Sequence, residues 1–158
     1  SEMCIRDRIE DYAFSSCHSL TKVNLSEGLE ILNNSVFFNC SELREIKLPS
    51  TLKEIGPSAF SGAALNNVVL PDSGKLTKID EYAFYQSREL TDITIPACIT
   101  SIPDNVFAEC SKEVTIHGAS GSYAQNYAKK NNLKFKADLA SSSTKATKAI
   151  GKAAEKAE

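Results

Sequence analysis

A repeat with a period of about 23 residues organises most of this chain. Five phenylalanines mark it, at Phe14, Phe37, Phe60, Phe84 and Phe107, so that they stand 23, 23, 24 and 23 residues apart. An aliphatic residue lies five positions before each Phe, and Ala or Val lies directly before it. A fixed period of this length is typical of a solenoid, in which a short coil buries its apolar side only when neighbouring coils stack on it.

Each coil also contains an aliphatic-x-aliphatic pair that predicts a short strand. The pairs alternate apolar and polar residues, as half-buried strands do; they are Val23/Leu25, Ile46/Leu48, Val68/Leu70, Ile93/Ile95 and Val114/Ile116. We expect one strand per coil, stacked as a parallel sheet at about 4.8 Å spacing. Residues 79–87 and their equivalents are expected to form a loop or a short helical or 3₁₀ turn. The five Phe side chains are expected to lie in the core.

The pattern divides the 158 residues into four segments. Residues 1–8, SEMCIRDR, share nothing with the repeat and resemble translated sequencing-adapter read-through, so they are interpreted as a non-native, artefactual lead-in; the alternative is an irregular natural segment. Residues 9–117 form five coils that begin at Ile9, Leu32, Ile55, Ile79 and Ile102, and coil three lacks one residue before Leu65.

The remaining two segments follow the last coil. Residues 118–137 are predicted to cap the array with a short helix, N-capped by Ser120 or Ser122, and a strand around 133–135. Residues 138–158 are rich in Ser, Thr, Ala and Lys and hold little to bury, which predicts a linker or tail.

The coils follow the consensus I-x-x-x-A-F-x-x-C-x-x-L-x-x-V-x-L-P, which resembles the BspA-like class of leucine-rich repeat. Residues 9–116 carry this resemblance, and HGASGSYAQNYAKKNNLKF is similar to the segment that commonly ends such arrays. The resemblance implies a leucine-rich repeat solenoid without enzymatic activity. It also implies a fragment of a larger secreted or surface-attached protein that binds host or neighbouring-cell partners.

The outward positions of the strands form the candidate binding surface, because in leucine-rich repeats this sheet lines an extended binding face. One column contains Lys22, Glu45, Asn67 and Asp92; the next contains Asn24, Lys47, Val69 and Thr94, with Thr115 placed after it. The charges alternate in sign, so no single charge class of ligand is favoured. The plainer interpretation is a solvated sheet face of mixed polarity.

Three functions are compatible with this architecture. The favoured one is an adhesin-like module that binds a host or neighbouring-cell protein or glycan at an extracellular or cell-surface location. The alternative is a structural spacer that holds another domain away from the cell envelope. An intracellular scaffold is the third.

The sequence offers little for catalysis, metal binding or nucleic acid. Cys17, Cys40 and Cys110 share one column with Ala63 and Ser87, which predicts a small buried position and free thiols. There is no C-x-x-C pair, the two His residues fall in different coils, and no catalytic motif occurs, so neither an enzyme nor a metal or cofactor is predicted. The net charge is −2, and residues 1–140 sum to −4, which argues against a nucleic-acid surface. The sequence contains no apolar run of about 18 residues, so it predicts no membrane-spanning segment.

Overall fold

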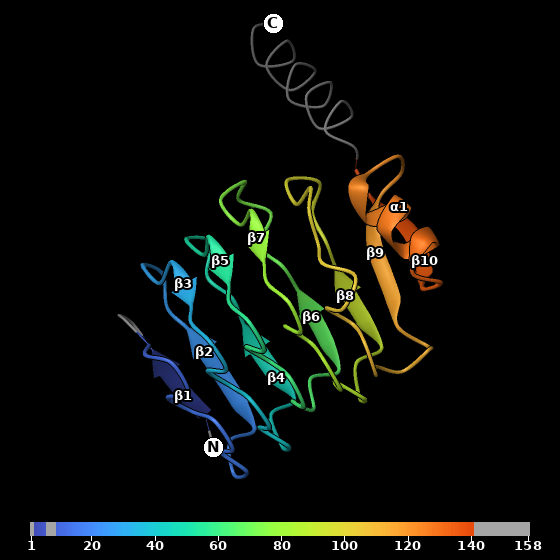
Figure 1. Cartoon of the computed structure of the whole chain (residues 1–158). Helices are drawn as coiled ribbons and strands as arrows, with labels where there is room; N and C mark the ends of the chain where they lie inside the picture. The colour runs from blue at the N-terminus through green and yellow to red at the C-terminus, as the bar shows by residue number, and fades with distance from the viewer. Residues whose placement is uncertain (1, 6–8, 141–158) are drawn as a thin grey trace, which may run out of the picture.

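The fold is a stack of coils whose strands form parallel sheets, and in the computed structural model in Figure 1 the coils follow one another from left (N-terminal) to right (C-terminal). The structure describes residues 2–5 and 9–140, so the predicted linker lies outside the described residues from 141 onwards. The predicted solenoid with a helix-strand cap is confirmed. Its larger face contains the strands β1 (Glu2–Ile5), β2 (Lys22–Leu25), β4 (Glu45–Lys47), β6 (Asn67–Val69), β8 (Asp92–Thr94), β9 (Thr115–Ala119) and β10 (Lys134–Leu139).

The lead-in segment departs from the expectation that it shares nothing with the repeat. The backbone of Glu2–Ile5 forms β1, which pairs in parallel with β2, and Met3 and Ile5 stand opposite Val23 and Leu25. The first strand of the face therefore lies before Ile9. Its artefactual origin stays a prediction.

The larger face is divided into two hydrogen-bonded sheets. The order β1-β2-β4 makes one, and β6-β8-β9-β10 makes the other, although β4 and β6 lie side by side in Figure 1. The division coincides with the residue that coil three lacks before Leu65. Since the chain from Phe60 to β6 is one residue shorter than the chain from Phe37 to β4, the two strands reach the face without forming a regular ladder.

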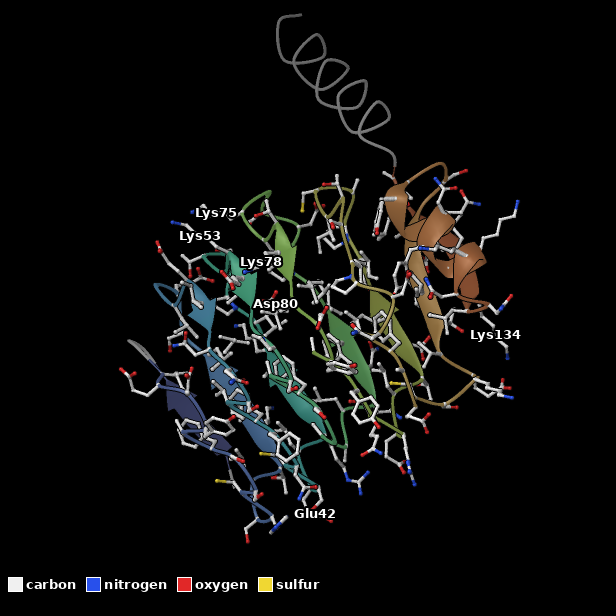
Figure 2. The ribbon with its side chains drawn as sticks, viewed as in Figure 1. Glu42, Lys53, Lys75, Lys78, Asp80 and Lys134 are labelled. Carbon is white, nitrogen blue, oxygen red and sulfur yellow. The ribbon has the colours of Figure 1, made fainter. Side chains whose placement is uncertain are left out.

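A second strand per coil was not predicted. The two-residue strands β3 (Ile31–Leu32), β5 (Glu54–Ile55) and β7 (Lys78–Ile79) pair in parallel as a smaller sheet. Their inward residues Leu32, Ile55 and Ile79 are the aliphatic column that precedes each Phe, and all three are buried. On the exposed side of this sheet, Nζ of Lys78 lies 2.9 Å from Glu54 and 3.3 Å from Asp80 (Lys78 and Asp80 are labelled in Figure 2).

The five Phe side chains form one continuous stack through the core. Successive ring centroids from Phe14 to Phe107 are 5.7, 5.6, 5.3 and 5.7 Å apart, and no pair of ring planes is inclined by more than 15°. Phe37, Phe60 and Phe84 are completely buried, whereas Phe14 at the end of the stack is only partly buried. This confirms the predicted register of the coils.

The segments around the Phe residues are hydrogen-bonded turns whose backbone serves two coils at once. In coil one, the N–H groups of Ala13 and Ser15 donate to carbonyls three residues back in the same coil. The intervening N–H groups donate to the next coil, as Phe14 N does to Val36 O at 3.0 Å. Hydrogen bonds from these turns therefore connect each coil to the next one.

The helix α1 (Tyr123–Lys130) and β10 close the last coil, as predicted. Ser122 is the N-cap, and its hydroxyl accepts from the N–H of Gln125. The ring of Tyr127 packs against Phe107 at a centroid distance of 6.1 Å and continues the aromatic stack. β9 runs through the predicted boundary at 117/118, and β10 extends to Leu139, two residues past the predicted end of the cap.

Candidate strand-face surface

The outward side chains of the larger face line up across the coils. Lys22, Glu45, Asn67 and Asp92 belong to one column, with Lys22 opposite Glu45 and Asn67 opposite Asp92. Asn24, Lys47, Val69 and Thr94 belong to the second, with Asn24 opposite Lys47 and Val69 opposite Thr94. The placement of Thr115 after the second column was wrong: Thr115 stands opposite Asp92 in the first, and His117 continues the second.

The polar residues of this face differ in how firmly they are held. Lys22 Nζ lies 3.4 Å from Glu45, but both side chains are largely in water, so this ion pair contributes little. Glu45, Lys47 and Asn67 are exposed in the middle of the face. The central polar positions are therefore available to a partner without the loss of a buried interaction.

Val69 is the apolar centre of this polar surface. It is 61% exposed, more than any other large apolar side chain that the structure describes. Its inward neighbours Val68 and Leu70 are buried, as are Val23 and Leu25 on β2. Ile46 and Leu48 of β4 are only partly buried, next to the division between the two sheets. Apolar surface is thus accessible on both sides of that division.

At the C-terminal end of the face, three side chains form a compact polar cluster. Nε2 of His117 lies 2.6 Å from Oδ1 of Asp92, and Nδ1 lies 2.6 Å from Oδ2 of Asp138. The second oxygen of Asp92 accepts from the hydroxyl of Thr91 at 2.8 Å. Asp92 on β8, His117 on β9 and Asp138 on β10 therefore link three strands.

The contacts in this cluster shift all three ionisation equilibria toward the charged forms. Hydrogen bonds to Asp138 and then Asp92 raise the pKa of His117, against the opposing effect of desolvation. The hydrogen bond from His117 lowers the pKa of Asp92 and of Asp138. His117 and Asp138 were not among the predicted site residues. His117 was recognisable as a repeat-column residue, but Asp138 reaches it through a register shift that no periodicity reveals.

The cysteine column consists of free thiols that bond to the backbone. Cys40 Sγ donates to the carbonyl of Phe14 at 3.0 Å, and Cys110 Sγ donates to that of Phe84 at 2.9 Å. Ser87, in the same column, donates to Phe60 O at 3.1 Å. Burial raises the pKa of the Cys40 and Cys110 thiols to about 11, so neither is a nucleophile at neutral pH. The free-thiol prediction is confirmed for Cys17, Cys40 and Cys110, but of these three only Cys40 is fully buried; Cys98 is also a free thiol.

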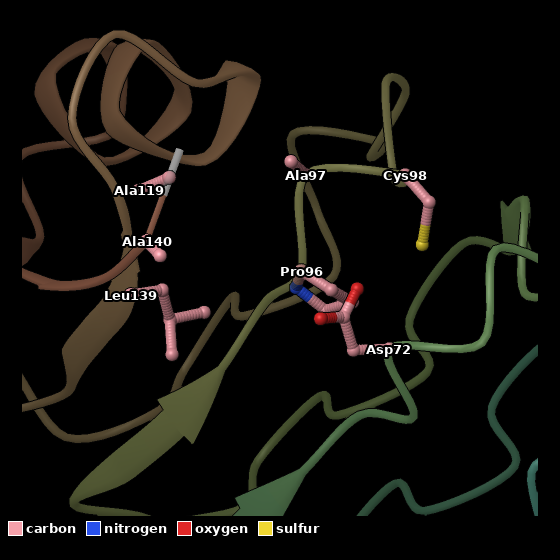
Figure 3. A pocket seen from close by; sticks show the side chains of 7 residues that line it. All are labelled: Asp72, Pro96, Ala97, Cys98, Ala119, Leu139 and Ala140. Carbon is pink, nitrogen blue, oxygen red and sulfur yellow. The ribbon is translucent and has the colours of Figure 1, made fainter. Parts of the chain in front are cut away.

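Other sites are sparse in the described part of the chain. No group of three or more His, Cys, Asp or Glu side chains within residues 2–5 and 9–140 has the arrangement of a metal site. None of the helices that the structure describes is long and apolar enough to cross a bilayer. A cavity of about 300 Å³ lies beyond the ends of β8 and β9, with Asp72 and Cys98 on one side and Leu139 on the other (Figure 3).

The repeat geometry and the sequence pattern define a class of protein. Residues 7–136 match the model of the BspA type leucine rich repeat region, in six copies. Because this match covers most of the chain, the protein belongs to the BspA-type leucine-rich repeat family.

Solved structures show the same fold. A leucine rich cell surface protein from Faecalibacterium prausnitzii superposes with a TM-score of 0.70 at 28% identity, over 87% of this chain and 36% of that one. The pneumococcal vaccine antigen PcpA does so with a TM-score of 0.65 at 19% identity, over 86% of this chain and 41% of that one. A leucine rich repeat protein from T. pallidum gives 0.52 at 23% identity, over 89% and 80%. This chain therefore spans less than half the length of the first two. No curated protein sequence matches it.

Proposed function

We propose that the protein is a recognition module of a secreted or cell-surface protein and that it binds a protein or glycan through the larger sheet face. The BspA-type repeat and the similarity to a leucine rich cell surface protein support this location. Leucine-rich repeats are typically non-enzymatic, and the face described above offers side chains for binding rather than for catalysis. The proposed contact residues are Lys22, Asn24, Glu45, Lys47, Asn67, Val69, Asp92 and Thr94.

The observation that carries this proposal is the exposure of Val69 within a polar surround. An apolar side chain ringed by polar groups is the arrangement that protein interfaces use, because the centre is desolvated and the rim supplies hydrogen bonds. Thr94 stands opposite Val69 on β8, Asn67 precedes it by two residues on β6, and Lys47 holds the equivalent position on β4. Nothing in the fold requires a Val at this outward position, since its side chain makes no part of the core.

The proposal is tested by substitution of Val69 and of a matched apolar residue elsewhere. Val69→Asp and Ile31→Asp each place a carboxylate at an exposed strand position, but Ile31 lies on the smaller sheet and is 44% exposed. Wild type and both variants are applied to a glycan array and to an array of extracellular protein domains. We expect binding to be lost at least tenfold in Val69→Asp and retained in Ile31→Asp, because a buried unpaired carboxylate costs more than 1.4 kcal/mol.

The outcome also separates recognition from a spacer function. A spacer uses the length and stiffness of the coil stack, so both variants would behave like the wild type in every assay. Binding that survives Val69→Asp and fails in Ile31→Asp would move the recognition surface to the smaller sheet. Either result would contradict the proposal.

A further inference from the structure

The cluster of Asp92, His117 and Asp138 connects the terminal strand to the rest of the larger face. Both ring nitrogens of His117 lie 2.6 Å from a carboxylate oxygen, one on β8 and one on β10. The imidazole is 19% exposed, and the carboxyl groups are 40% and 35% exposed, so the cluster is partly shielded but remains in reach of water. The cluster bears on how the C-terminal strand β10 is attached to the coil stack, which is a separate question from the binding role proposed above.

We propose that this cluster is a pH-dependent clasp, which holds the end of β10 on the coil stack while His117 is protonated and releases it when His117 is neutral. A protonated imidazole has two N–H groups and donates to both carboxylates at once. A neutral imidazole has one N–H, so its other nitrogen turns a lone pair toward a carboxylate that has only lone pairs. Loss of one proton therefore removes one of the two links.

The strand arrangement decides which link is lost. β8 is paired on both sides, with β6 and β9, and Asp92 is also held by the hydroxyl of Thr91. Among the described residues, β10 is the edge strand and pairs with β9 on one side, and its register shifts between Ala137 and Leu139, directly at Asp138. The backbone that carries Asp138 is thus less constrained than the backbone that carries Asp92. Deprotonation frees the end of β10 and leaves the Asp92–His117 contact in place.

The charges around His117 favour its protonated form. From β8 it faces Asp92, with Thr91 and Thr94 beside it; from β10 it faces Asp138 and Lys136. Lys136 acts on both carboxyl groups. α1 lies against Gly118, whose side of β9 is opposite to that of His117. With His117 protonated, the two cations balance the two carboxylates; without its proton, the cluster carries one net negative charge.

The pH range of the clasp follows from the directions of the shifts. The pKa of His117 is raised, so its contribution is complete below the ordinary value of 6.5 and is lost as the pH rises through the raised value. The pKa of each carboxyl is lowered, so their contribution is present above the ordinary value of 3.8 and is lost in stronger acid. The clasp is closed in mildly acidic solution and opens as the pH rises through the raised pKa of His117.

The test follows His117 and the β10 amides by NMR in the full chain. The imidazole signals of His117 are titrated beside those of His18, and amide protection factors, corrected for intrinsic exchange, are measured for β10 and β2 across the same pH range. We expect His117 to titrate above 6.5. Protection of β10 falls by at most about tenfold for each unit by which the pKa of His117 is raised, because Asp92 also contributes to that shift, while protection of β2 stays constant.

Two substitutions complete the test. Asp138→Asn keeps a hydrogen-bond acceptor and removes the charge, so the pKa of His117 falls and the protection of β10 no longer changes through the titration. His18→Gln, in coil one, leaves both quantities as in the wild type. The proposal is overturned if His117 titrates at or below 6.5, if wild-type β10 keeps its protection while His117 deprotonates, or if Asp138→Asn does not move the pKa of His117.

Discussion

Around each core Phe, the turn places individual residues in the left-handed backbone region. For the first four Phe, positive φ angles occur two residues before and two residues after the ring, as at Ser58 and Gly62 around Phe60, and at Tyr82 and Gln86 around Phe84; around Phe107 the positive φ is at Glu109, after the ring. These conformations let alternate N–H groups point into the coil and toward the next coil. A side chain at such a position carries a steric cost that glycine avoids.

Gly62 and Gln86 occupy the same repeat position, so a glycine can be removed at one and introduced at the other. We expect Gly62→Ala to lower the free energy of unfolding by about 1 kcal/mol, because φ is +71° there and an added Cβ would meet no atom closer than 3.5 Å. Strain, and not a clash, is then the cause. Gln86→Gly, where φ is +54°, should raise the free energy by up to about 1 kcal/mol. Urea unfolding measures both; changes of the same sign in the two variants would refute this account.

At the scale of the element, the cap is held to coil five by a few directional contacts. The hydroxyl of Tyr127 donates to the carbonyl of Pro103 at 2.9 Å, and that of Tyr123 bonds to the backbone of Ile102. Lys130 lies 2.9 Å from Asp104 on the surface. The buried aromatic contacts orient α1, since the exposed ion pair adds little.

Removal of one hydroxyl tests the orientation of the cap. Tyr127→Phe keeps the ring on Phe107 but leaves the carbonyl of Pro103 without this partner, so we expect a loss of about 1 kcal/mol. Tyr12→Phe is the control, because Tyr12 is 57% exposed and its hydroxyl makes only a 3.4 Å contact with Asn34. Thermal and urea unfolding of both variants suffice. An equal effect in the two would mean that the buried hydroxyl does not stabilise the cap.

Over the whole molecule, stability depends on the continuity of the aromatic stack. Phe60 has neighbours on both sides at 5.6 and 5.3 Å, whereas Phe14 has one neighbour at 5.7 Å and is partly exposed. In a solenoid, each repeat is stabilised mainly by its immediate neighbours. A central coil should therefore be more sensitive to truncation of its Phe than a terminal one.

Phe60→Ala is expected to cost about 3–5 kcal/mol, because it opens a cavity in a completely buried part of the core. Phe14→Ala should cost clearly less, since one face of its ring lacks a stacked Phe. Equilibrium urea unfolding at one pH gives both values. A loss in Phe14→Ala that equals or exceeds the loss in Phe60→Ala would show that the stack is not the main source of stability.

What the sequence by itself determined is the periodic part of the structure. The spacing of Phe14 to Phe107 identified the coils, and the aliphatic pairs identified the strands β2, β4, β6, β8 and β9, because side chains that recur with the coil must occupy the same place in a stack. Composition and spacing also revealed the capping helix. The outward columns of the face followed from alternation, except that Thr115 was assigned to the wrong one.

Only the tertiary structure decided how the coils join. The division between β4 and β6, the smaller sheet, the participation of Glu2–Ile5 and the reach of Asp138 to His117 are absent from the pattern. Periodicity reports which positions are equivalent and which face inward. Hydrogen-bond ladders depend on strand offsets of a few ångströms, which a single missing residue before Leu65 or a register shift at Asp138 is enough to change.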